Sequence, residues 1–307
     1  MKKINKITSK RKFTLSETAI SYLYLLPFLG LFFLFILLPV FVSFILSFFD
    51  FDMVSTPIFT GVDNYRRMFV KDSTFSTVLG NTLKFAVVTG PVGYMLAFVL
   101  AWLINEFHPI VRNILSFLFY APALVGNVYY IWTIAFSGDS FGYVNNLLIS
   151  FGFITEPIQW FKNTDYNMII IMIVQLWMSM GVSFLANIAG LQNVNTELYE
   201  AGAIDGIKTR WHELWYITLP SMGNILLFSA VMQIQSVFSI SAVVTNLAGY
   251  PSVNNSVDTI VSYIHDVGTM RYEMGYAAAL SFFLFLLMAI TRVVIGSLLN
   301  LIGKSSD

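Results

Sequence analysis

The sequence predicts an all-α integral membrane protein with six transmembrane helices. Hydrophobic residues make up 57% of its 307 residues and charged residues only 11%, against about 25% charged in soluble domains. The mean hydropathy is +0.72. A soluble fold of this size needs more polar surface, and a disordered chain needs low hydrophobicity with high net charge. The composition therefore excludes both classes. Equal numbers of basic and acidic residues, 17 of each, give no reason to expect nucleic acid as a partner.

Long stretches without charged residues define the expected helices. A helix needs about 20 mostly apolar residues to cross about 30 Å of hydrocarbon. The stretch between Glu213 and Asp258 could hold two spans, but residues 245–255 are polar and turn-rich, so we expect a loop there. The six helices are then centred near residues 34, 95, 125, 178, 232 and 286.

The distribution of Lys and Arg predicts the orientation. Residues 1–18 form a basic tail, which should lie in the cytoplasm because positive charge concentrates on that side of a membrane. Six crossings then place the C-terminus in the cytoplasm as well. The apolar run of the first helix, residues 19–49, is longer than the core of a secretory signal, about 7–15 residues, so we expect a membrane anchor.

The segment after this anchor, residues 50–84, is expected to be an outer loop, and residues 85–303 to be a transmembrane core of five helices. Within the outer loop, Val62, Tyr65 and Met68 fall at helical spacing. This pattern is compatible with an amphipathic helix at the membrane interface and equally with a solvated loop helix.

The inner loop at residues 195–220 predicts a helix, a glycine turn and a second helix. Asn195 or Thr196 can cap the first helix, and Gly206 can take the left-handed conformation that ends it. A second helix can restart at Thr209, with Trp211, Leu214, Trp215 and Thr218 on one face. Three consecutive small residues, Ala201, Gly202 and Ala203, would let another protein approach the first helix closely, unless they are small by chance.

The segment from Glu200 to Pro220 resembles the EAA loop of ABC importer permeases. The positions that match its pattern are Glu200, Ala201, Asp205, Gly206, Ile217, Leu219 and Pro220. Two departures are visible: Gly202 replaces the second alanine, and one extra residue separates Gly206 from Ile217. Flanking segments are similar to carbohydrate-uptake permeases of the maltose type; these segments are residues 61–65, 81–83, 120–122 and 272–277.

The resemblance implies a type I importer permease fold in the plasma membrane of a prokaryote. It implies a subunit that transports a sugar or oligosaccharide and is not itself an enzyme. The implied partners are a second permease, two cytoplasmic ATPases that bind ATP, and an extracytoplasmic solute-binding protein. The residues implied in docking the ATPases are Glu200, Ala201, Gly202, Ala203, Asp205, Gly206, Leu219 and Pro220.

Polar residues inside the predicted helices are the candidates for a substrate path. The fourth helix carries Gln175, Trp177, Ser179, Ser183 and Asn187, and the fifth carries Ser229, Gln233, Gln235 and Ser236. Uncharged amides and hydroxyls suit sugar hydroxyls, and Trp177 could stack on a sugar ring. The same residue types also join neighbouring helices, so both interpretations stay open.

Alternative functions are an ion-coupled carrier and an ABC permease for another solute. An ion-coupled carrier usually places ionisable residues inside the membrane, and the predicted helix cores contain none. The chain has no phosphate-binding Walker motif, because Leu298 stands where Gly303-Lys304-Ser305 would need an upstream glycine. We therefore expect no catalytic residues, no metal and no cofactor in this chain.

Overall fold

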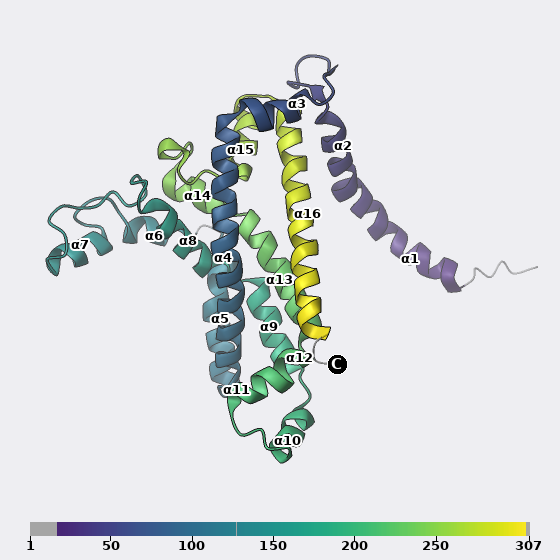
Figure 1. The fold of residues 1–307 in the computed structure, drawn as a ribbon, viewed down its shortest axis with the longest axis vertical. Helices are drawn as coiled ribbons and strands as arrows, with labels where there is room; N and C mark the ends of the chain where they lie inside the picture. The colour runs from purple at the N-terminus through teal and green to yellow at the C-terminus, as the bar shows by residue number, and fades with distance from the viewer. Residues whose placement is uncertain (1–16, 127, 305–307) are drawn as a thin grey trace, which may run out of the picture.

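The computed structural model describes residues 17–126 and 128–304, which form a long bundle of helices (Figure 1). Residues 1–16 of the predicted basic tail lie outside this range. The elements of the first half are α1 (Glu17–Phe32), the π-helical turn η1 (Phe33–Leu37), α2 (Leu38–Leu46), β1 (Phe49–Asp50), β2 (Ile58–Phe59), α3 (Asp63–Arg66), the π-helical turn η2 (Arg67–Lys71), α4 (Ser73–Asn105), α5 (Pro109–Leu124), α6 (Tyr130–Ala135) and α7 (Tyr143–Ser150).

The second half folds back along the first. Its elements are α8 (Asn167–Met178), α9 (Val182–Gln192), α10 (Thr196–Ile204), α11 (Arg210–Glu213), the π-helical turn η3 (Leu214–Thr218), α12 (Leu219–Ser221), α13 (Gly223–Phe238), α14 (Ser241–Ala248), the 3₁₀ turn η4 (Val253–Asn255), α15 (Ile260–His265), the π-helical turn η5 (Asp266–Met270) and α16 (Met274–Lys304). The strands β1 and β2 pair antiparallel, with Phe49 opposite Phe59.

Several helices are long and apolar enough to cross a membrane. These segments are Tyr22–Leu46, Ser73–Asn105, Gly223–Ala248 and Met274–Leu298. The pair α8 and α9, bent by 41° at a short break, makes a fifth candidate. The remaining apolar helix, α5, has 16 residues, fewer than the roughly 20 that a full crossing needs.

Two helix boundaries differ from those expected from the sequence. α4 begins at Ser73, well before the expected boundary after residue 84, and α14 occupies part of the expected loop at residues 245–255. Charged and polar residues mark where hydrocarbon ends, whereas a helix ends where its backbone is capped. Asp72 caps α4 by accepting a hydrogen bond from the Phe75 N–H at 3.1 Å, so the helix extends beyond its apolar part.

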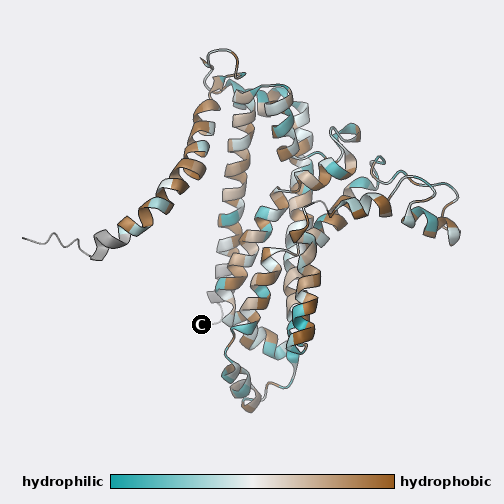
Figure 2. Cartoon of the chain, turned by 180° about the vertical axis from the view of Figure 1, so that it is seen from behind, coloured by the Kyte–Doolittle hydropathy of each residue, from teal (hydrophilic) through white to brown (hydrophobic). Residues whose placement is uncertain are grey.

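The first two helices leave the bundle (Figure 1). α2 still contacts α16, where the Phe44 and Phe282 rings lie 4.6 Å apart and the Ser43 hydroxyl donates to the Ala278 carbonyl at 3.5 Å. Beyond that contact, the segment Tyr22–Leu46 buries no part of its apolar window. Figure 2 shows hydrophobic residues along most of α1 and α2, as a helix surrounded by lipid requires.

Three apolar clusters follow one another along the bundle. The first cluster includes Phe184 and Leu214, near the loop at residues 195–220. The second cluster includes Phe85 of α4, and the third includes Phe75 of α4 and Leu280 of α16. Since α4 contributes to all three clusters, it forms the central support of the fold.

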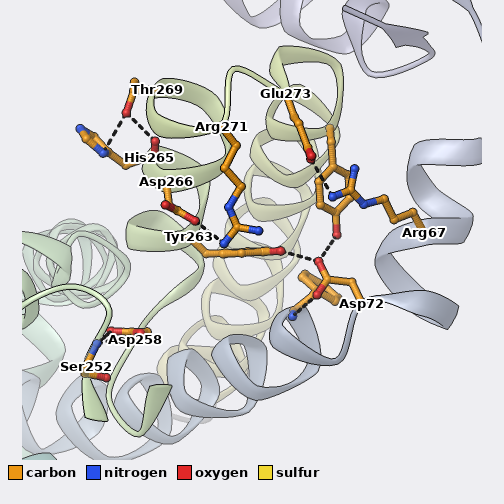
Figure 3. A network of polar contacts seen from close by, with 12 residues as sticks. Arg67, Asp72, Ser252, Asp258, Tyr263, His265, Asp266, Thr269, Arg271 and Glu273 are labelled. Atoms are coloured by element: carbon orange, nitrogen blue, oxygen red, sulfur yellow. Dashed lines mark hydrogen bonds and ion pairs between the residues drawn. The ribbon is translucent and has the colours of Figure 1, made fainter. Parts of the chain in front are cut away.

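A polar network closes the end of the bundle at which α4 begins (Figure 3). The Asp72 carboxylate accepts hydrogen bonds from the Tyr263 and Tyr276 hydroxyls, each at 2.6 Å. Arg67 forms an ion pair with Glu273 at 2.6 Å, and its guanidinium lies 4.1 Å from the centre of the Tyr276 ring. The network joins the start of α4 to α15 and α16. Burial raises the pKa of Asp72, but the hydrogen bonds from the two tyrosines and from the backbone of Thr74 and Phe75 together hold that pKa below its ordinary value.

We predict that Asp72→Ala destabilises the protein by about 1–3 kcal/mol, because the helix cap and the acceptor of two buried hydroxyls are lost together. A group whose pKa is depressed in the folded state adds stability above its unfolded value, here near 3.8, and loses it as pH falls through the folded pKa. The difference between wild type and variant should therefore persist at neutral pH and shrink only in strong acid.

Thermal unfolding of the detergent-solubilised protein at pH 7 and at lower pH measures this difference. Asp52→Ala is the matched control, because Asp52 bonds only to neighbouring residues of an exposed loop. Equal melting temperatures for Asp72→Ala and wild type at neutral pH would show that the network contributes nothing to stability.

Candidate functional site

The structure confirms the predicted course of the loop at residues 195–220, called the coupling loop below. The Asn195 side chain caps α10 by accepting the Glu197 N–H at 3.1 Å. Gly206 has φ of +95°, the left-handed conformation expected of it. The Ile207 N–H then donates to the Gly202 carbonyl at 2.9 Å, which closes the end of α10. Thr209 caps α11 by accepting the His212 N–H at 3.3 Å.

The three small residues of α10 do not share one role. Ala201 and Ala203 are exposed, as are Glu200 and Asp205, but Gly202 is buried. A Cβ at Gly202 would lie 2.7 Å from Cδ1 of Ile217 and 3.2 Å from Cδ1 of Ile207. Successive helical residues point about 100° apart, so the middle of three small residues faces the loop itself. Gly202 therefore permits packing within this chain, contrary to the expectation that it gives a partner access.

The second arm of the coupling loop also differs from expectation. Leu214 and Thr218 are buried, whereas Trp211 and Trp215 are more than 60% exposed, so the four do not share a face. The turn from Leu214 to Thr218 is π-helical, and its wider spacing changes the register assumed for an α-helix. Inside the loop, the Tyr199 and Thr218 hydroxyls lie 2.9 Å apart and are hydrogen bonded.

The coupling loop also exposes two apolar side chains that the sequence did not identify. Ile204 is 87% exposed and Tyr216 is 72% exposed. Of the two remaining implied residues, Pro220 is exposed and Leu219 is half-buried. Periodicity could not have found Ile204, because it sits at the last position of α10 where the pattern ends. An exposed apolar surface of this kind is typical of a protein contact.

The coupling loop contacts the C-terminal end of α4 through an ion pair and an aromatic pair. The Arg210 guanidinium forms ion pairs with Glu106 at 2.9 Å and with Glu213 at 2.7 Å. These carboxylates raise the pKa of Arg210, the hydrogen bond to Glu213 having the largest effect. The Trp102 and Trp211 rings lie 5.3 Å apart. A displacement of the loop would therefore act on α4 as well as on α9, which precedes it.

A cavity of about 430 Å³, called the polar hollow below, opens where α8 and α9 meet. The residues that line it are Ala123, Gly126, Tyr129, Gln175, Met178, Ser179, Gly181, Val182, Ser183, Met232, Gln235, Ser236, Ser239, Ala242 and Val243. The helical backbone is interrupted beside it, at the 41° break between α8 and α9. Interrupted backbone at membrane depth is tolerated where it lines such a cavity.

The substrate-path residues predicted on the fourth and fifth helices, called the two stripes below, fall into two groups: some line the polar hollow and the others do not. Five of their residues line it, namely Gln175, Ser179, Ser183, Gln235 and Ser236. The Gln175 amide donates to Oγ of Ser236 at 3.3 Å and to its carbonyl at 3.2 Å, which joins α8 to α13 across the hollow. Ser239, three residues beyond Ser236 in the chain, also lines the hollow.

The other four residues of the stripes lie outside the polar hollow. Gln233 and Ser229 are buried between helices: Oε1 of Gln233 accepts from the Ser183 hydroxyl at 3.4 Å, and the Ser229 hydroxyl donates to the Ser183 carbonyl at 3.4 Å. Asn187 is fully buried in α9. Trp177 packs edge-on against Trp132, with ring centres 5.5 Å apart. For Gln233, Ser229 and Trp177 the structure supports the interpretation as contacts between helices, whereas the buried amide of Asn187 has no hydrogen-bond partner among the described residues.

The chain is similar in sequence to known membrane transport proteins. Residues 90–304 match the family described as "Binding-protein-dependent transport system inner membrane component". The arabinooligosaccharides transport system permease protein AraP of Bacillus subtilis (strain 168) is 30% identical, covering 91% of this chain and 88% of that protein. The lactose transport system permease protein LacF of Rhizobium radiobacter is 28% identical, covering 88% and 90% respectively.

The fold is also similar to a solved structure. One chain in the crystal structure of a bacterial alginate ABC transporter, in complex with an alginate pentasaccharide-bound periplasmic protein, superposes with a TM-score of 0.77. It is 22% identical, and the match covers 93% of this chain and 95% of that one. The resemblance inferred from the coupling loop is thus confirmed, and the chain belongs to the family of binding-protein-dependent transport system inner membrane components.

Proposed function

We propose that this chain is one of two related permease subunits of an ATP-driven importer for a sugar or oligosaccharide. A solute-binding protein delivers the substrate from outside, and two cytoplasmic ATPases dock on the coupling loops and bind the ATP. Family membership makes this chain a transport component rather than an enzyme. The relatives are transport permeases for arabinooligosaccharides and lactose, which supports a carbohydrate substrate.

The proposed placement has six membrane crossings, with both termini and the coupling loop in the cytoplasm of a prokaryotic cell. The crossings are α1–α2, α4, α5, α8–α9, α13–α14 and α16. Lys208 and Arg210 in the coupling loop and Arg292 in α16 support an inner position, because basic residues favour that side. The outer network of Asp72 then stands outside the membrane.

The polar hollow is the observation that carries the proposed substrate. Its lining combines amides and hydroxyls with Ala, Val and Met side chains and, among the residues that the structure describes, contains no Asp, Glu, Lys, Arg or His. Uncharged donors and acceptors match sugar hydroxyls, which need several hydrogen bonds and no counter-ion. An ion-coupled carrier would place an ionisable group in such a position. The hollow therefore favours a neutral, hydroxyl-rich substrate that passes by alternating access.

We predict that Gln235→Ala raises the KM for uptake about 2- to 12-fold, since one hydrogen bond contributes about 0.5–1.5 kcal/mol. Gln235 is exposed in the hollow and its loss should leave the melting temperature unchanged. Gln233→Ala is the matched control: it removes a buried amide from a helix contact and should lower the melting temperature. Radiolabelled uptake of arabinose- and galactose-containing oligosaccharides at limiting concentration measures the effect. Wild-type uptake by a stable Gln235→Ala protein would remove the hollow from the substrate path.

We predict that Gly206→Val abolishes most ATPase co-purification and uptake. A Cβ at Gly206 would meet nothing within 4 Å, so the effect comes only from the left-handed backbone, where a β-branched residue costs about 1–2 kcal/mol. Gly206→Asn is the matched control, because Asn adopts this conformation more readily. Ala201→Trp should also block docking, by adding bulk to an exposed position without changing the turn.

Membrane insertion should be normal in all three variants, because the loop lies outside the hydrocarbon. Affinity purification of the tagged permease followed by quantification of the bound ATPase measures docking. Full retention of ATPase and uptake by both Gly206→Val and Ala201→Trp would show that α10 is not the docking helix.

A further inference from the structure

Residues 130–166, called the outer lobe below, project sideways from the bundle and carry α6 and α7 (Figure 1). They lie outside the coupling loop, and Trp132, Phe136, Trp160 and Phe161 pack against the apolar cluster that includes Phe85. The lobe is folded around one side chain. Asn145 is fully buried; its amide donates to the carbonyls of Ser137, Asp139 and Ile158, and its oxygen accepts from the Ile158 N–H and the Trp160 indole.

The helix α7 exposes large apolar side chains. Asn145 faces inward and Leu148 and Ile149 are half-buried, while Tyr143, Leu147 and Phe151 are 67%, 56% and 72% exposed, beside the exposed Asn146 and Ser150. The three large exposed side chains lie four residues apart and therefore form one stripe along the helix. Phe141 and Phe153 extend the exposed apolar surface at both ends. The hydrogen bonds of Asn145 hold this stripe in a fixed orientation, so its exposure is part of the fold.

The helix lengths place the outer lobe at the outer boundary of the hydrocarbon. α4 and α5 meet at the inner end, and α4, with 33 residues, is about 50 Å long at 1.5 Å per residue. α5, with 16 residues, rises only about 24 Å, less than the roughly 30 Å of the hydrocarbon. The chain therefore leaves α5 near the outer boundary. Figure 1 agrees, because α6 and α7 lie lower along the bundle than α3 and α15.

The charge pattern separates a lipid surface from a soluble partner. No charged residue occurs between Asp139 and Glu156, a stretch that includes the whole of α7. The same lobe also exposes apolar residues of α6, such as Ile131 and Ile134. Exposed aromatic and leucine side chains on a short helix beside the membrane are typical of an interfacial anchor.

We propose that α7 is a membrane-interface anchor: Tyr143, Leu147 and Phe151 insert into the outer boundary of the bilayer and hold the outer lobe beside the polar hollow. The lobe lies beside the polar hollow because Tyr129, which lines the hollow, immediately precedes α6. Because α7 carries no basic residue, its insertion does not depend on anionic lipid, unlike that of basic amphipathic helices. The proposal rests on the membrane placement given under the proposed function.

This chain contains no cysteine, so a single spin label introduced into it has no background from the chain itself. The assembled transporter in lipid nanodiscs, labelled at Leu147→Cys or Phe151→Cys, is exposed to oxygen and to a water-soluble nickel chelate. We expect oxygen collisions to exceed nickel collisions severalfold at both sites, as they should at Phe117→Cys on the exposed face of α5. The water control is Thr56→Cys, in the exposed outer loop. The ratio should be the same in zwitterionic lipid and in lipid containing phosphatidylglycerol.

Each other outcome overturns the proposal in a distinct way. Nickel collisions at Leu147 and Phe151 as frequent as at Thr56 would place α7 in water. Exclusion of both reagents would show that protein, such as the second permease, covers the stripe. A water-like ratio at Phe117 would instead show that the membrane placement itself is wrong, whatever the result at α7.

Discussion

The close approach of α4, α9 and α13 is the constraint on which the bundle depends. A Cβ at Gly93 of α4 would lie 2.2 Å from Nε2 of Gln233, and one at Gly190 of α9 would lie 2.8 Å from Cε of Met222. Between helices in a membrane, where lipid is as apolar as leucine, small residues of this kind allow the dispersion contacts that hold helices together. These two glycines leave room for the Gln233 and Met222 side chains between the helices, and Met222 belongs to the apolar cluster that includes Phe184.

The same close approach decides the role of each polar residue in the stripes. Where α13 lies tightly against α4 and α9, Gln233 and Ser229 are enclosed and must find partners within the protein, because an unpaired polar group in hydrocarbon is costly. Where the break at the end of α8 turns that helix aside, the surfaces separate and Gln235 faces the polar hollow. Residues of one periodic pattern therefore have two roles: some pack between helices and others line the cavity, and the local distance between the helices decides which.

The sequence predicted the features that depend on local chemistry. Charge-free stretches located the helices, and the Asn195 cap and the left-handed Gly206 followed from residue type alone. It could not predict that α4 continues to Asp72, because the cap is completed by tyrosines about two hundred residues away. Nor could it separate Gly202 from Ala201, since only the folded loop places Ile217 against the glycine. Which stripe residues line a cavity likewise depends on helix crossings that no period in the sequence contains.

The coupling loop and the polar hollow are connected by a short and continuous route. α9 ends at Gln192 and α10 begins at Thr196, so α10 is joined almost directly to the helix that carries Ser183. The other end of α9 meets the break beside the hollow, and the ion pair of Arg210 with Glu106 fastens the loop to α4. A rigid shift of the loop would therefore move α9 relative to α8 at a point where no continuous helix resists bending. The break that opens the hollow is thus also the place where movement of the coupling loop can change its shape.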